Sequence, residues 1–129
     1  MRKLLLLILP LLVLSVVAAG CTNAGRQRGV KSMTLDFSGE GSGEHEKTES
    51  CDTDGQLSGD GNIDDGTLHV TLEDGDGNVV FDQTYNGDIK FTSTSVTGHD
   101  GTWTLRGERS RDDVLGDDFK GHYTFNLVC

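Results

Sequence analysis

The sequence predicts an all-β domain over residues 32–129, built as a small antiparallel β-sandwich of Ig-like or jelly-roll-like type and stapled by one disulfide. Apolar and polar residues alternate at a period of two, these segments recur about every ten residues, and clusters of glycine and aspartate separate them. No segment after residue 22 shows the 3.6-residue period of a helix. A small β-barrel would give the same pattern and stays open as an alternative.

The first half of the domain carries the weaker strand signals. A short strand is predicted first, from three apolar residues at period two: Met33, Leu35 and Phe37. Residues 38–50 are glycine-rich and then polar, which indicates a loop followed by an exposed edge strand. Residues 51–66 are dense in Asp and Gly, with Leu57 and Ile63 as their only apolar residues besides Cys51. We expect a long turn-rich loop there.

The second half alternates more clearly. In residues 67–73, Leu68, Val70 and Leu72 share one face, and the following segment DGDGN predicts a β-hairpin across Asp74–Asn78, because Asp-Gly and Gly-Asn accept positive φ. Three further extended segments follow, which are residues 88–97, 102–108 and 119–129. We expect Trp103 to lie in the core and residues 109–118 to form a charged loop. The alternation places Cys129 on the same inward face as the apolar residues of the last strand, Tyr123, Phe125 and Leu127.

The first 20 residues differ in character from the rest of the chain. Arg2 and Lys3 form a positive head, residues 4–17 are mainly apolar, and Ala18, Ala19 and Gly20 are small. These are the parts of a secretory signal peptide. The stretch 4–20 has 17 residues, whereas a transmembrane helix usually needs about 20. A retained membrane span is therefore the second interpretation.

The segment Val17-Ala18-Ala19-Gly20-Cys21 resembles the lipobox of prokaryotic membrane lipoproteins, although Leu is usual where this chain has Ala18. In that family the cysteine thiol receives a diacylglyceryl group, and cleavage leaves the cysteine as the new N-terminus. The resemblance implies a signal peptide over residues 1–20, lipid on Cys21, and a lipidated basic tether over residues 21–31. It implies export and anchoring in a membrane, at the cell surface or its periplasmic face. An ordinary secretory signal followed by a chance cysteine is the alternative.

The chain has three cysteines, an odd number for an exported protein. If Cys21 carries lipid, Cys51 and Cys129 remain as the one possible pair. Export implies an oxidising compartment, in which a disulfide persists. We therefore expect a Cys51–Cys129 disulfide, with two free thiols as the alternative.

The domain is strongly acidic. From Ser32 onward there are six Lys and Arg against 21 Asp and Glu, a net charge of −15. Arg26, Arg28 and Lys31 precede it and would be drawn to anionic lipid head groups. The acidic domain itself would be repelled by nucleic acid, which excludes that partner. It suggests instead a basic protein or peptide partner, for which the domain would act as an inhibitor or trap.

Calcium is the one cofactor that the composition suggests, because it takes six to eight hard oxygen ligands. The candidate ligands lie in the expected loop over residues 52–65 and are Asp52, Asp54, Asp60 and Asp64. EF-hand spacing is absent, since position twelve counted from Asp60 is Thr71. A calcium-supported adhesion module is thus a hypothesis, and ordinary Asp-Gly turns are the other interpretation.

Nothing in the sequence predicts catalysis. The four histidines share no local ligand spacing, and no phosphate loop or paired nucleophile and base is recognisable. The sequence therefore predicts a lipid-anchored exported protein with a non-catalytic binding or structural domain, and an enzyme is the least favoured alternative.

Overall fold

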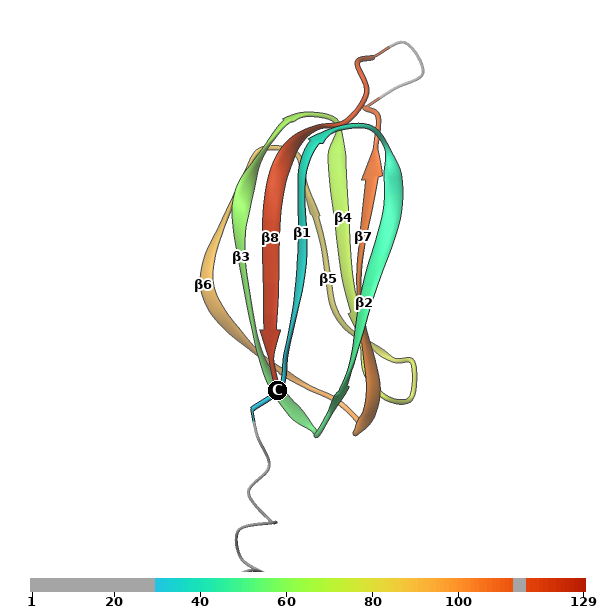
Figure 1. The fold of residues 1–129 in the computed structure, drawn as a ribbon, viewed down its shortest axis with the longest axis vertical. Helices are drawn as coiled ribbons and strands as arrows, with labels where there is room; N and C mark the ends of the chain where they lie inside the picture. Colours follow the sequence, from blue (N-terminus) through green and yellow to red (C-terminus); the bar gives the residue numbers. More distant parts are fainter. Residues whose placement is uncertain (1–29, 113–115) are drawn as a thin grey trace, which may run out of the picture.

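The computed structural model describes residues 30–112 and 116–129, shown in Figure 1. The predicted signal peptide and Cys21 lie outside the described residues. The chain is all-β, as the sequence predicts, and the strands within the described ranges are β1 (Ser32–Glu40), β2 (Gly43–Cys51), β3 (Asp54–Asp65), β4 (Thr67–Glu73), β5 (Val79–Tyr85), β6 (Asp88–Thr97), β7 (Gly101–Ser110) and β8 (Lys120–Val128). None of these residues forms a helix long and apolar enough to cross a membrane.

The strands form two antiparallel sheets that pack face to face as a sandwich (Figure 1). One sheet has the order β1-β8-β3-β6, and the other has the order β2-β7-β4-β5. The sandwich prediction is confirmed. The barrel alternative is wrong, because β1 and β6 remain edges of one sheet and β2 and β5 remain edges of the other.

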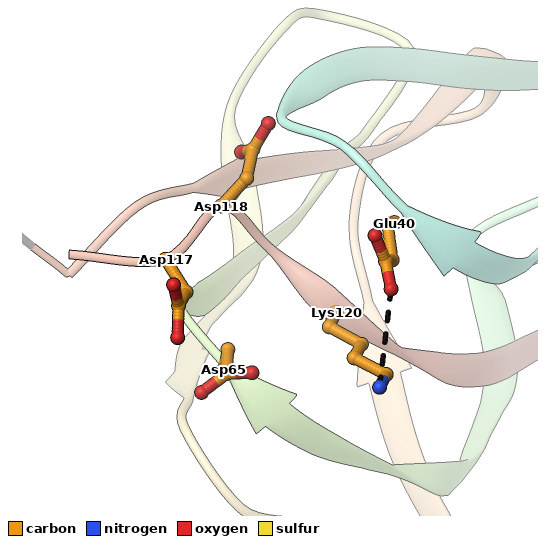
Figure 2. Close-up of a pocket in the computed structure, with 5 residues that line it drawn as sticks. All are labelled: Glu40, Asp65, Asp117, Asp118 and Lys120. Carbon is orange, nitrogen blue, oxygen red and sulfur yellow. Dashed lines mark ion pairs between the residues drawn. The ribbon is translucent and has the colours of Figure 1, made fainter.

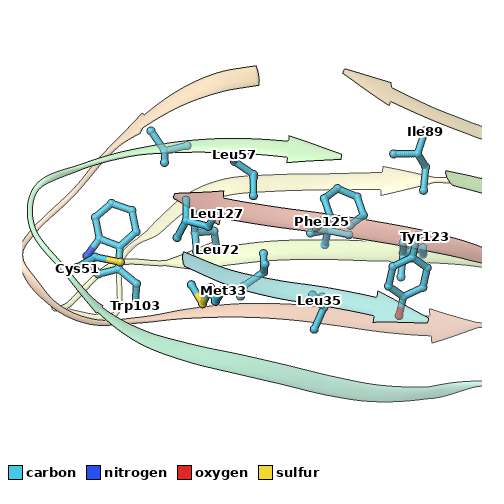
Figure 3. Close-up of a cluster of buried hydrophobic side chains, with 14 of the residues drawn as sticks. Met33, Leu35, Cys51, Leu57, Leu72, Ile89, Trp103, Tyr123, Phe125 and Leu127 are labelled. Carbon is cyan, nitrogen blue, oxygen red and sulfur yellow. The ribbon is translucent and has the colours of Figure 1, made fainter. Parts of the chain in front are cut away.

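The core lies between the sheets and follows the alternation that the sequence shows (Figure 3). In β4 the side chains of Leu68, Val70 and Leu72 have no exposed surface, while their neighbours are partly exposed. Trp103 is also fully buried, and its Nε1–H donates to the carbonyl oxygen of His99 at 2.8 Å. The buried indole N–H is therefore satisfied, as burial of a polar group requires.

Cys51 and Cys129 form the predicted disulfide, with their Cα atoms 5.5 Å apart. Cys51 ends β2 in one sheet, and Cys129 follows β8 in the other, so the bond joins the two sheets at one end of the sandwich. Lys31 and Cys129 also exchange backbone N–H···O hydrogen bonds of 3.1 and 2.8 Å. The chain thus enters the domain and ends at the same place, here called the disulfide end.

The segment 51–66 is not the expected loop. Most of it is the 12-residue strand β3, which lies between β8 and β6. Three of its inward positions are glycines: Gly55, Gly59 and Gly61. In the β3–β8 register two of these glycines face aromatic residues, Gly59 opposite Phe125 and Gly61 opposite Tyr123. A Cβ added to Gly61 would lie 2.3 Å from the carbonyl oxygen of His122, so the close approach of β8 requires glycine.

The hairpin predicted across Asp74–Asn78 is confirmed, since β4 and β5 pair on either side of it. Asp74 is 3% exposed, and its carboxylate accepts backbone N–H bonds from Asp76, Asn78 and His99 at 3.0, 2.9 and 2.8 Å. The N–H of His99 is the main reason that the pKa of Asp74 falls from 3.8 to about 2. This carboxylate ties the hairpin to the turn between β6 and β7.

Candidate functional site

A shallow acidic hollow of about 270 Å³ lies at the end of the sandwich opposite the disulfide. Figure 2 shows the side chains that line it. β1 contributes Glu40, β3 contributes Asp65, and the segment that leads into β8 contributes Asp117 and Asp118. Lys120, the first residue of β8, completes the lining. We call this region the acidic end. It lies one nine-residue strand from the disulfide end, or about 30 Å.

Asp118 organises the backbone around the hollow. Its Oδ1 accepts the N–H of Phe119 at 2.8 Å and the N–H of Ser42 at 3.0 Å, and the Arg111 guanidinium lies 3.7 Å away. The bond from Phe119 is the main cause that lowers the pKa of Asp118, with Ser42 and Arg111 adding to it. A further bond runs from the N–H of Gly41 to the carbonyl oxygen of Phe119 at 2.8 Å. Together these bonds hold the β1–β2 turn against the segment before β8.

The remaining charges of the hollow are poorly balanced. Glu40 and Lys120 form an ion pair at 3.8 Å, as Figure 2 shows. Within the described residues, the side chains of Asp65 and Asp117 make no hydrogen bond or ion pair, although the backbone of Asp65 pairs with Lys120. Of the four lining carboxylates, Glu40 is thus paired with Lys120 and Asp118 with Arg111, and the other two are ion-paired with no cation among the described residues. Such a surface suits an ammonium or guanidinium group of a partner.

The outer face of the sheet β2-β7-β4-β5 is also rich in carboxylates. The Arg106 guanidinium, on β7, contacts Glu44 at 3.0 Å, Glu46 at 2.8 Å and Glu73 at 3.5 Å. The shallow groove of about 210 Å³ around Arg106 is also lined by Glu108. The bond to Glu46 is the main cause that raises the pKa of Arg106. This face thus already holds one guanidinium between three carboxylates.

The aspartates predicted as calcium ligands are spread along a strand and not gathered in a loop. Asp52 precedes β3, Asp54 begins it, and Asp64 is its second-last residue. Asp54 and Asp64 are ten positions apart along the strand, a distance of about 30 Å. Asp60 lies between them on an exposed position. The structure therefore does not bring the four together, and in residues 30–112 and 116–129 no three His, Cys, Asp or Glu side chains are placed to hold a metal ion.

The histidines show what sequence reasoning missed. His122 is exposed on the outer face, and His69 is partly exposed beside Asp82, with its Nε2 2.6 Å from the carboxylate. His45 instead stacks on Tyr123 and hydrogen bonds to Arg109. These three residues are 64 and 14 positions apart along the chain and meet only through the sheet topology. No local spacing could have revealed them.

No protein-family model matches this chain, and no curated protein matches it. Among solved structures, a chain in a structure of infectious bursal disease virus Gx strain is similar, with 12% sequence identity and a TM-score of 0.35. The match covers 76% of this chain and 33% of that one, so the present chain spans about a third of the viral protein's length. A likeness this distant indicates nothing about function.

Proposed function

We propose that this chain is an exported protein held on a membrane by lipid on Cys21, and that its β-sandwich has a binding or structural role and not a catalytic one. The Cys51–Cys129 disulfide is the observation that carries this proposal. Disulfides of this kind are typical of exported proteins in oxidising compartments. The pairing also leaves Cys21 as the odd cysteine, directly after the apolar run and the small residues of a signal peptide.

The position of the disulfide end gives this proposal an orientation. Lys31, the last residue of the proposed tether, pairs with Cys129 at that end. A lipid on Cys21 would therefore hold the disulfide end toward the membrane. The acidic end would lie about 30 Å farther out, where a partner can reach it. Repulsion between the acidic domain and anionic lipid favours the same orientation.

A second candidate function, the capture of a basic protein or peptide, is favoured by the unbalanced carboxylates of the acidic end and by the three carboxylates around Arg106. Opposite charge speeds association and selects the partner. The calcium-supported adhesion module and the enzyme stay as hypotheses. Neither is supported by a grouped site within the described residues.

Lipid attachment is tested by feeding cells a labelled fatty acid and isolating the protein. We expect label in the wild-type protein and none in Cys21→Ser, because the thiol is the proposed acceptor. Thr22→Ser is the matched control and should be labelled like the wild type. Absence of label from the wild-type protein, or equal label in Cys21→Ser, would contradict the proposal.

Capture of a basic partner is tested with an arginine-rich peptide titrated into the protein at rising salt. We expect Asp65→Asn to bind more weakly than Asp60→Asn, which also removes one carboxylate but lies outside the hollow. Binding that disappears at moderate salt, or that falls equally in both variants, would indicate nonspecific attraction and refute capture at the acidic end.

A further inference from the structure

Four side chains from four strands meet in the seam between the two sheets, close to the acidic end. This seam cluster consists of Phe37 on β1, His45 on β2, Arg109 on β7 and Tyr123 on β8. The guanidinium carbon of Arg109 lies 3.8 Å from the centre of the Phe37 ring, a cation–π contact. The rings of His45 and Tyr123 stack at 5.9 Å with an angle of 18°.

The sequence leaves room for this cluster. His45 faces Gly107 in the β2–β7 register, so the residue opposite His45 on β7 carries no side chain. A Cβ added to Gly107 would lie 3.3 Å from the hydroxyl of Tyr123. The Nε–H of Arg109 donates to the carbonyl oxygen of Gly41 at 2.9 Å. Arg109 therefore connects the seam cluster to the β1–β2 turn.

The contacts fix the protonation state of His45. Arg109 Nη1 lies 2.9 Å from His45 Nδ1, and a guanidinium can only donate, so Nδ1 is the acceptor and carries no proton. The proton of the neutral ring is then on Nε2, which faces the Tyr123 hydroxyl at 3.5 Å. A second proton on the ring would go to Nδ1. It would remove the acceptor and place a positive charge against Arg109.

We propose that His45 is a proton-sensitive latch: in its neutral form it holds Arg109 and the β1–β2 turn in place, and its protonation releases that turn at the acidic end. The proposal rests only on contacts within the domain and is independent of the lipid anchor and of any partner.

The groups that face His45 favour its neutral form on balance. Burial is the largest cause that lowers the pKa of His45 below 6.5, and the charges of Arg109 and Lys47 add to it. Asp36, on β1, opposes them. As the pH falls below 6.5, the unfolded chain takes up its proton first. The contribution of His45 to stability is therefore present above pH 6.5 and is lost as the pH falls through its lower folded-state pKa.

The test is nuclear magnetic resonance of the processed protein recovered from cells, with the imidazole nitrogens followed between about pH 5 and pH 8. We expect the Nε2–H tautomer of His45 at neutral pH and a titration midpoint below 6.5. An Nδ1–H tautomer, or a midpoint at or above 6.5, would overturn the proposal. This measurement needs no variant and so does not depend on one folding.

Amide hydrogen exchange then tests release of the turn. The N–H groups of Gly41 and Ser42 are bonded to Phe119 and Asp118, and they should lose protection at acid pH in the wild type. His45→Asn keeps an acceptor for Arg109 but cannot titrate, so it should lose less. His122→Asn removes an exposed histidine from the outer face and should behave like the wild type. An equal pH response in wild type and His45→Asn would overturn the latch.

Discussion

Replacing Cys51 and Cys129 with alanine removes a covalent link between the two sheets. The bond closes a loop over a sequence separation of 78 residues. Chain entropy gives such a loop about 4–5 kcal/mol of stabilisation at 25 °C. A small domain has a free energy of unfolding of about 5–15 kcal/mol, so the double variant should be close to its stability limit. Its melting temperature should fall by about 20 °C or more.

The assay is guanidinium unfolding followed by the fluorescence of Trp103, which is buried and is the sole tryptophan of the chain. The reduced wild-type protein is the control, because it lacks the bond but keeps both sulfur atoms. The difference in free energy of unfolding between the oxidised and the reduced wild type measures the contribution of the covalent link. The difference between the reduced wild type and the variant measures the contribution of sulfur packing, mainly at Cys51, which is 6% exposed. A link worth less than about 1 kcal/mol would refute the reasoning from loop closure.

Three further predictions concern the turn, the core and the acidic strand. The free energy of unfolding should fall less between about pH 5 and pH 3 in Asp74→Asn than in the wild type, as measured by urea unfolding. The Asp74 carboxylate has a pKa of about 2, so it stabilises the fold fully above its ordinary value of 3.8 and loses this contribution as the pH falls toward 2. Equal responses to pH in the two proteins would contradict this. Leu105→Ala, at a fully buried position, should lower the free energy of unfolding by about 2–5 kcal/mol in the same measurement. Val79→Thr, at a position 53% exposed, should change it by no more than about 0.5 kcal/mol. Equal losses of stability in the two variants would be inconsistent with the core described. Calcium chloride and sodium chloride at matched ionic strength should shift the melting temperature equally, because the predicted ligands lie apart along β3; a specific calcium shift at low millimolar concentration would reveal a site.

The clearest sequence patterns predicted the fold where large apolar residues alternate. Leu68, Val70 and Leu72 are buried as their spacing requires, and the hairpin at Asp74–Asn78 follows from turn chemistry that is local. Cys129 directly follows β8 and packs against the core, as the alternation of β8 predicts, and it is bonded there to Cys51. In these cases the sequence pattern that supports the prediction lies within a few residues of the chain, even where the contact itself is distant.

β3 was mispredicted as a loop because its inward positions include Gly55, Gly59 and Gly61, which carry no apolar side chain for the pattern to show. Their neighbours supply the bulk, since Phe125 and Tyr123 face two of them from β8. A segment rich in Asp and Gly indicates a turn only when its glycines are not required for the close approach of a neighbouring strand. Because residues 54–65 form a strand, the predicted calcium-binding loop does not exist as a loop.

The acidic end and the seam cluster could be predicted only in part. The sequence predicts a charged loop over residues 109–118, but the position of Asp117 and Asp118 beside Glu40 and Asp65 depends on which strands end together. The position of His45 beside Arg109 depends on the order β2-β7 in one sheet and on the packing of β8 across the seam. Strand order is a property of the whole chain and leaves no local mark in the sequence.

Intact mass and N-terminal analysis of the protein isolated from membranes test the central claim most directly. The account predicts a chain that begins at Cys21, carries the added mass of a diacylglyceryl group on that residue, and retains the Cys51–Cys129 disulfide. An unmodified chain that begins at any other residue would contradict it.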